Sequence, residues 1–284
     1  MYALLSTVFT GVGVFMHKIA VERGYTPTVM TVVGDFVIIL FAFIALIFTG
    51  SGENHWMLGL LFGSATGLIY VVSMLMRMES LKHIDTAIFF PLYKTISPLI
   101  ALVVGILFFN EWFTKLEALG IMLGIVVPLL LIHKSEHARQ GNLHKGLVFL
   151  TVTAFLTIAS QAMAKHGTSL FDNIFIFIIM STTFSMLGGI AIHMFKSKKS
   201  NIINTDFKNM KIIMLATCAG TMQFASYSLV MFAYKTGSLA IVYTINSFYI
   251  LIPIILSIII YQEHWNARKA FAIGLSIVAL AFLH

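Results

Sequence analysis

Two stretches of the sequence decide the fold: GILFFNEWFTKLEALGIML at residues 105–123 and SIIIYQEHWNARKAFAIGL at residues 257–275. They align without gaps at an offset of 152 residues (257 minus 105), and Glu111 then falls on Glu263. Each stretch joins the end of one apolar run to the start of the next. The chain therefore contains an internal duplication.

A second, weaker alignment supports the duplication and extends it toward the beginning of each half. HKIAVERG at residues 17–24 aligns with SQAMAKHG at residues 160–167. We therefore divide the sequence into two repeats, residues 1–140 and residues 141–284.

The composition indicates a protein whose main solvent is lipid. The chain is 59% hydrophobic and 10% charged, whereas a soluble domain has roughly 25% charged residues. The single cysteine, Cys218, excludes an internal disulfide and a thiolate metal cage. The net charge of +7 does not indicate nucleic acid, because the basic residues lie in short links between apolar runs.

The apolar runs predict membrane-spanning helices. A spanning helix needs about 20 mostly apolar residues, and ten runs qualify. They lie near residues 2–20, 27–49, 56–77, 86–109, 113–133, 146–164, 173–195, 210–232, 238–261 and 267–283. The runs are too long and too continuous for barrel strands, and residues 2–16 lack the basic segment and cleavage site of a signal peptide.

Five helices in each repeat is an odd number, so the second repeat must enter the membrane in the opposite direction to the first. The fold class predicted is thus an all-α polytopic membrane protein, with ten transmembrane helices as two inverted five-helix repeats, an arrangement typical of secondary transporters. Lysines and arginines fall mostly in the odd-numbered links, against only Lys115, Lys165 and Lys235 in the even-numbered ones. This bias puts both termini outside the cytoplasm.

The duplicated motif resembles the EamA-type carriers of the drug/metabolite transporter superfamily. Its first copy, SPLIALVVGILFFNEWFTKLEALGIMLG at residues 97–124, has the proline, the helix of apolar residues, the loop glutamate and the small residues of that family. The second copy, at residues 252–276, keeps the glutamate but has Pro253 three residues late. The chain departs from the family at Asp35, near a position where an arginine is common.

The resemblance implies a transporter, not an enzyme, in the plasma (bacterial inner) membrane, and it implies cytoplasmic termini, against the charge bias. It also implies alternating-access export of amino acids or related small polar or amphipathic metabolites. The partners expected are the lipid bilayer, the substrate and protons as a coupling ion, with no cofactor. A lipid or glycolipid flippase on the same fold remains the alternative.

Lys94, in FFPLYKTISPL at residues 89–99, is the leading candidate for a substrate contact. A lysine at the centre of a spanning helix costs about 2.5–3.5 kcal/mol on insertion scales, so such charges usually have a function. At the repeat offset Lys94 falls on Asn246, which predicts two polar side chains at similar depth. A cationic Lys94 would favour a carboxylate or phosphate.

Asp35 is the acid that lies deepest within the ten runs. It lies at the same predicted depth as Lys94, so the two could form an ion pair that is either structural or broken by substrate or proton. Other polar side chains within the runs are either ligands or helix–helix hydrogen-bonding groups; these are Tyr70, Gln161, Gln223, Tyr227, Tyr243, Thr244 and Tyr249.

Three further features have structural or catalytic interpretations. The ladder Gly59, Gly63 and Gly67 predicts close helix packing. Glu111 precedes the fifth run, where a carboxylate complements a helix dipole. HKSEH at residues 133–137 matches the inverted zinc-protease pattern, which gives an intramembrane metal enzyme as a further alternative.

Overall fold

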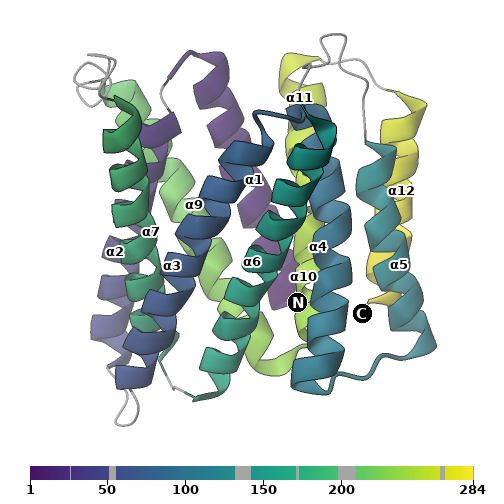
Figure 1. Ribbon diagram of the computed structural model, residues 1–284, viewed down its shortest axis with the longest axis horizontal. Helices are drawn as coiled ribbons and strands as arrows, with labels where there is room; N and C mark the ends of the chain where they lie inside the picture. The colour runs from purple at the N-terminus through teal and green to yellow at the C-terminus, as the bar shows by residue number, and fades with distance from the viewer. Residues whose placement is uncertain are drawn as a thin grey trace. The chain divides into compact units, whose positions relative to one another are not determined.

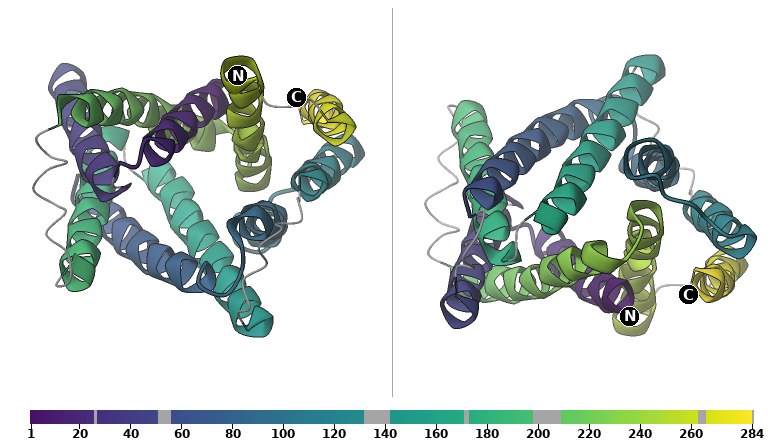
Figure 2. Two further views of the ribbon diagram at one scale, coloured as in Figure 1. Left: turned by 90° about the horizontal axis from the view of Figure 1, so that it is seen from above. Right: turned by 90° about the horizontal axis from the view of Figure 1, so that it is seen from below.

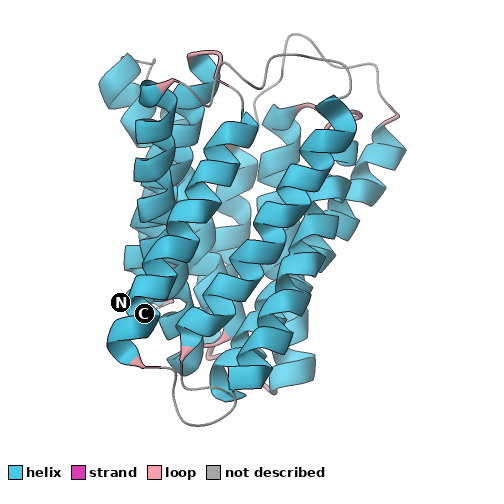
Figure 3. Cartoon of the chain, turned by 90° about the vertical axis from the view of Figure 1, so that its left-hand side faces the viewer, coloured by secondary structure: helices cyan, strands magenta, loops and turns pink. Residues whose placement is uncertain are grey.

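The computed structural model describes residues 1–25, 27–50, 56–131, 142–170, 173–197, 209–262 and 266–283, and these are helical with no strand (Figure 3). The helices are α1 (Tyr2–Glu22), α2 (Pro27–Thr49), α3 (Trp56–Ser80), α4 (Thr86–Phe109), α5 (Lys115–Leu130), α6 (Leu143–Leu170), α7 (Ile174–Ser197), α9 (Met210–Thr236), α10 (Leu239–Ser247), the 3-10 helix η1 (Phe248–Ile250), α11 (Leu251–Tyr261) and α12 (Ala267–Phe282).

Each of the ten predicted runs corresponds to a helix, with α10, η1 and α11 together forming the ninth. Eight of these segments are long and apolar enough to cross a membrane. The other two, α5 and α12, have 16 residues each and span about 24 Å at 1.5 Å per residue. The prediction of residues 113–133 for the fifth span was too long at its start, because Thr114 caps the helix and the residues before it are not helical.

The chain forms two compact units, and each takes helices from both sequence repeats. The first unit contains residues 1–71 and 163–235, and the second contains residues 72–162 and 236–284. The predicted boundary between the two repeats at residue 140 describes the sequence and not these compact units. It stays a prediction.

In the first unit, glycines allow helices to pack closely. A Cβ atom on Gly63 would lie 2.8 Å from the Phe177 carbonyl oxygen, and one on Gly67 would lie 2.5 Å from that of Ser181. The predicted packing role of this ladder is therefore confirmed, and the partner is α7, which also packs against α2 (Figure 1).

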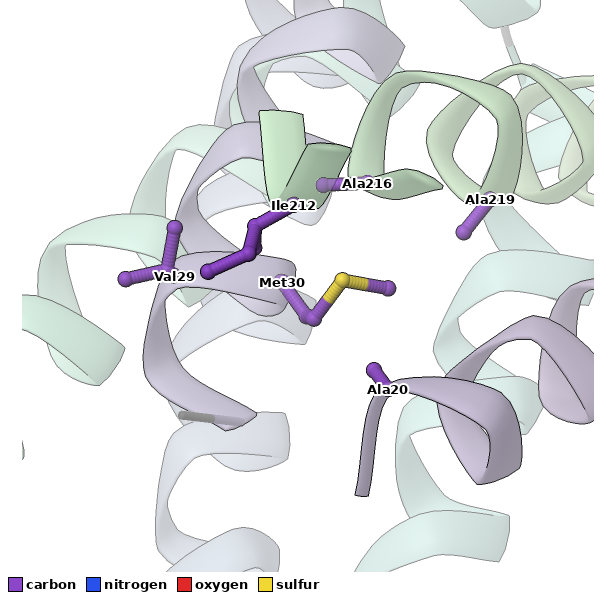
Figure 4. Packing of buried hydrophobic residues seen from close by; sticks show 6 residues of the cluster. All are labelled: Ala20, Val29, Met30, Ile212, Ala216 and Ala219. Carbon is purple, nitrogen blue, oxygen red and sulfur yellow. The ribbon is translucent and has the colours of Figure 1, made fainter. Parts of the chain in front are cut away.

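A cluster of buried apolar side chains joins α1, α2 and α9 in the same unit (Figure 4). Met30 is fully buried, and its side chain lies among the surrounding members of the cluster. The cluster consists of Ala20, Val29, Met30, Ile212, Ala216 and Ala219. The three alanines and the flexible Met30 allow the helices to approach closely at this cluster.

The second unit contains both copies of the duplicated motif, and their local structures repeat. Helix α4 ends at Phe109 and α11 ends at Tyr261, each followed by a left-handed residue, Asn110 (φ 50°) and Gln262 (φ 53°). The helices that follow, α5 and α12, begin and end at the same 152-residue offset (267 minus 115, and 282 minus 130). The two copies of the motif thus share their local backbone structure.

Equivalent helices in the second unit run in opposite directions. Gly120, near the start of α5, approaches the carbonyl of Ala279, near the end of α12, and these two helices lie side by side (Figure 2). Likewise, Glu111 follows the end of α4 and contacts Leu239 at the start of α10. An inverted repeat requires each of these pairs to run in opposite directions. How the two halves enter a membrane stays a prediction.

Candidate substrate-binding site

Helix α4 continues through both of its prolines, Pro91 and Pro98. Because Pro98 has no N–H, the carbonyl of Lys94 lacks the donor that an α-helix would normally provide. Nearby hydroxyls bond to the same helix: Thr95 Oγ1 donates to the Pro91 carbonyl at 3.0 Å, and Ser97 Oγ donates to the Tyr93 carbonyl at 2.7 Å. The helix therefore lacks one backbone hydrogen bond at Lys94.

The Lys94 ammonium lies among three tyrosine rings. Its Nζ is 4.4 Å from the ring centroid of Tyr249, 5.5 Å from that of Tyr93 and 5.6 Å from that of Tyr243. The rings come from three segments, η1, α4 and α10, and the Lys94 residue is only 7% exposed. Each ring face attracts the cation electrostatically at these distances.

Tyr93 contacts residues from several helices around Lys94. Its ring stacks on Phe89 with centroids 5.8 Å apart, and the Arg77 guanidinium carbon lies 5.3 Å from its centroid. Its side chain is also hydrogen-bonded to Thr157 of α6 and to Tyr243 of α10. Tyr93 is 5% exposed, so one buried ring contacts α3, α4, α6 and α10 and lies beside two cations.

The electrostatics of the site favour an anion. Among the described residues of the second unit, no carboxylate lies within ion-pair distance of Lys94. Cation–π contacts stabilise an ammonium by about 0.5–2 kcal/mol each, and they supply no formal negative charge. A carboxylate or phosphate entering the site would therefore find a positive charge already held in place.

The ninth span is broken beside this site. Helix α10 ends at Ser247, η1 follows, and α11 begins at Leu251. Pro253 cannot donate the α-helical hydrogen bond to the carbonyl four residues before it, that of Tyr249, which explains a tighter 3-10 turn there. Just before the break, Thr244 is fully buried and its Oγ1 has no hydrogen-bond partner among the described residues.

The structure brings together three of the predicted site residues, Lys94, Tyr243 and Tyr249. Asn246 lies half-buried on α10, which packs against α4. Gln161 lies on α6 in the same unit. The roles of Asn246 and Gln161 toward a substrate stay predictions.

The other four predicted residues, Asp35, Tyr70, Gln223 and Tyr227, lie in the first unit. Asp35 on α2 is hydrogen-bonded to Ser185 of α7, and its buried Oδ2 has no hydrogen-bond partner among the described residues.

Hydrogen bonds and packing account for most of the rest of this group. The hydroxyls of Tyr227 and Ser181 are hydrogen-bonded at 3.0 Å, and Tyr70 neighbours Tyr227. The Gln223 side chain packs against Gly13. Tyr227 and Gln223 thus join helices, which is the packing interpretation of these side chains. Because Asp35 and Lys94 belong to different units, their ion pair stays a prediction.

Sequence reasoning missed Tyr93 and Arg77. Tyr93 directly precedes Lys94 in the sequence, which could have marked it as a neighbour of the site. Adjacent residues of a helix usually point to different sides, however, so the sequence did not favour it. Arg77 lies at the end of the third predicted span, residues 56–77, where a basic residue is expected near a link.

The predicted structural role of Glu111 at a helix start is confirmed, but the helix is α10 and not α5: the carboxylate accepts from the start of α10, whereas α5 is capped by Thr114 and Glu117. Residues 133–137 lie outside the described residues, among which no cluster of three potential metal ligands occurs.

The described residues are all helical, and their eight long apolar spans indicate a multi-pass membrane protein. Residues 1–132 match the EamA-like transporter family. Over these residues, which are fewer than half of the chain, the match confirms the resemblance predicted from the duplicated motif, and it indicates a drug/metabolite-type transporter in general terms.

The other comparisons are informative about the fold alone. One solved crystal structure is similar over 98% of this chain and 96% of its own chain, with a TM-score of 0.72 and 12% sequence identity. At that identity the likeness shows a common fold and nothing about substrates. No curated protein matches the sequence.

Proposed function

We propose that this protein is a secondary carrier that moves a small polar or amphipathic metabolite bearing a carboxylate or phosphate. It would work by alternating access in the plasma (bacterial inner) membrane, in the direction of export. The observation that carries this proposal is the buried Lys94 ammonium, held by three tyrosine rings without a carboxylate partner among the described residues of its unit.

The chemistry around Lys94 also suggests the form of the substrate. The anionic group would pair with the ammonium, and an apolar part would lie against the tyrosine rings. The Lys94 carbonyl, which Pro98 leaves without its helical donor, could accept from a substrate ammonium or hydroxyl group. An amino acid or a related metabolite combines these features.

The test is counterflow in proteoliposomes with a panel of amino acids, hydroxy acids, phosphate esters and simple amines. We expect exchange of one of the anionic or zwitterionic groups and loss of that exchange in Lys94→Gln. Lys115→Gln is the matched control, because Lys115 is exposed at the start of α5. Equal transport by Lys94→Gln and the parent would remove the Lys94 site, and movement of fluorescent lipid without solute counterflow would favour a flippase.

Asp35 is our candidate for proton coupling. Its support is a buried Oδ2 that has no hydrogen-bond partner among the described residues, on a carboxylate otherwise bonded to Ser185. A carboxylate in such surroundings can alternate between neutral and charged forms during a transport cycle. We expect Asp35→Asn to abolish accumulation driven by a pH gradient while counterflow persists. Intact pH-driven accumulation in this variant would exclude Asp35 as the coupling group.

A further inference from the structure

The carboxylate of Glu111 binds the start of α10. Its Oε1 accepts from the Leu239 N–H at 2.6 Å, and its Oε2 accepts from the Ala240 N–H at 3.5 Å. The next N–H, that of Ile241, donates to Ser238 Oγ at 3.1 Å. The first three N–H groups of α10, which have no partner within their own helix, thus all have side-chain acceptors.

The end of α4 is built to direct Glu111 toward α10. Asn110 adopts a left-handed conformation, and the Glu111 N–H donates to the Gly105 carbonyl at 3.0 Å. The carboxylate then folds back over Gly105, where a Cβ atom would clash with Oε2. Only glycine leaves this space open, so Gly105 and Glu111 form one arrangement.

Glu111 is not needed for the helix that follows it in sequence. Helix α5 begins with its own capping box, in which the Glu117 N–H donates to Thr114 Oγ1 at 3.2 Å and the Thr114 N–H donates to Glu117 Oε2 at 2.7 Å. The bond from Glu111 to α10 therefore connects two spans that are distant in the sequence.

We propose that Glu111 is a positioning residue for the substrate site. It fixes the start of α10 to the end of α4, and so it sets where Tyr243 of α10 and the adjoining Tyr249 lie around Lys94 of α4. This inference rests on the proposed function of the Lys94 site. Glu111 itself does not contact substrate.

Two independent changes should weaken this connection. Glu111→Ala removes both acceptor oxygens, and Gly105→Ala keeps the carboxylate but occupies the space that it needs. Glu111→Gln keeps one acceptor oxygen without the charge, so it should retain part of the effect. Glu117→Ala is the matched control, because Glu117 caps α5 alone.

The experiment combines hydrogen–deuterium exchange of the α10 amides with counterflow kinetics, both on the full chain in lipid. For Glu111→Ala and Gly105→Ala we expect exchange at residues 239–241 to accelerate about tenfold, the size typical of a lost helix cap. The KM for the transported substrate should rise by a similar factor of about ten, with a smaller change in maximal velocity. Glu111→Gln should fall between these variants and the parent, and Glu117→Ala should match the parent.

Each alternative result separates the two proposals. Unchanged exchange in Glu111→Ala overturns the connection to α10. Faster exchange with an unchanged KM, while Lys94→Gln fails to transport, leaves Glu111 with a structural role and overturns the positioning role alone. Normal transport by Lys94→Gln removes the substrate site and the positioning role together.

Discussion

Replacing Gly67 by alanine tests whether the close contact between α3 and α7 stabilises the first unit. The new Cβ would lie 2.5 Å from the Ser181 carbonyl oxygen and 2.7 Å from the Phe184 Cβ. Carbon–oxygen contacts between helices are ordinarily about 3.3 Å or longer, so the two helices would have to separate locally by about 0.8 Å. The obstructing oxygen belongs to a helix backbone and cannot rotate away.

The matched control for this change is Gly189→Ala on α7, where a Cβ would meet nothing within 4 Å. Both substitutions gain the same helix propensity of about 1 kcal/mol, so their difference isolates the cost of the clash. Overpacking costs about 1–3 kcal/mol, and we expect Gly67→Ala to be less stable than Gly189→Ala by that amount.

The assay is reversible unfolding in mixed micelles with increasing SDS, followed by circular dichroism. The separation should also lengthen the hydrogen bond from Ser181 to Tyr227, which crosses from α7 to α9. Equal free energies of unfolding for the two alanine variants would refute the reasoning, because the contact would then be soft enough to yield without cost.

Three other changes follow from the geometry of the second unit. Tyr249→Leu removes the ring closest to Lys94 and should lower the free energy of unfolding by about 0.5–2 kcal/mol, whereas Tyr249→Phe, which keeps the ring, should match the parent in the same SDS titration. Gly124→Ala places a Cβ 2.5 Å from Thr244 Cγ2 and should destabilise the protein by about 1–3 kcal/mol. Adding Thr244→Ser, which removes that methyl group, should recover stability, and a double variant that stays unstable would contradict the contact. Thr114→Ala removes the cap of α5 and should cost about 1 kcal/mol, seen as faster amide exchange at the start of α5 with α12 unaffected.

The sequence was sufficient for the number and order of the spans, because hydropathy is a local property that needs no knowledge of packing. The duplication was also visible, and the backbone repeats it down to the left-handed residues Asn110 and Gln262. Lys94 could be found because a charge within an apolar run is costly wherever the helix faces.

What surrounds Lys94 could not be derived in the same way. The contact with Tyr249 depends on how α4 and the broken ninth span are rotated about their axes, and periodicity is uninformative when all faces of a helix are apolar. The target of Glu111 was predicted wrongly for a related reason: the left-handed turn at Asn110 determines the direction of the carboxylate, and that turn is formed by a residue other than glycine.

The duplication and the asymmetry of the site together explain why Lys94 has no charged counterpart in the second copy. Lys94 comes from the first copy, and the repeat offset places Asn246, a neutral residue, at the equivalent position of the second. Conversely, Tyr249 of the second copy corresponds to Ser97 of the first. A second lysine at residue 246 would put two like charges on packed helices in a medium of low dielectric constant, where repulsion is strong. Divergence between the copies, with Lys94 from one and two of its three rings, Tyr243 and Tyr249, from the other, avoids that repulsion.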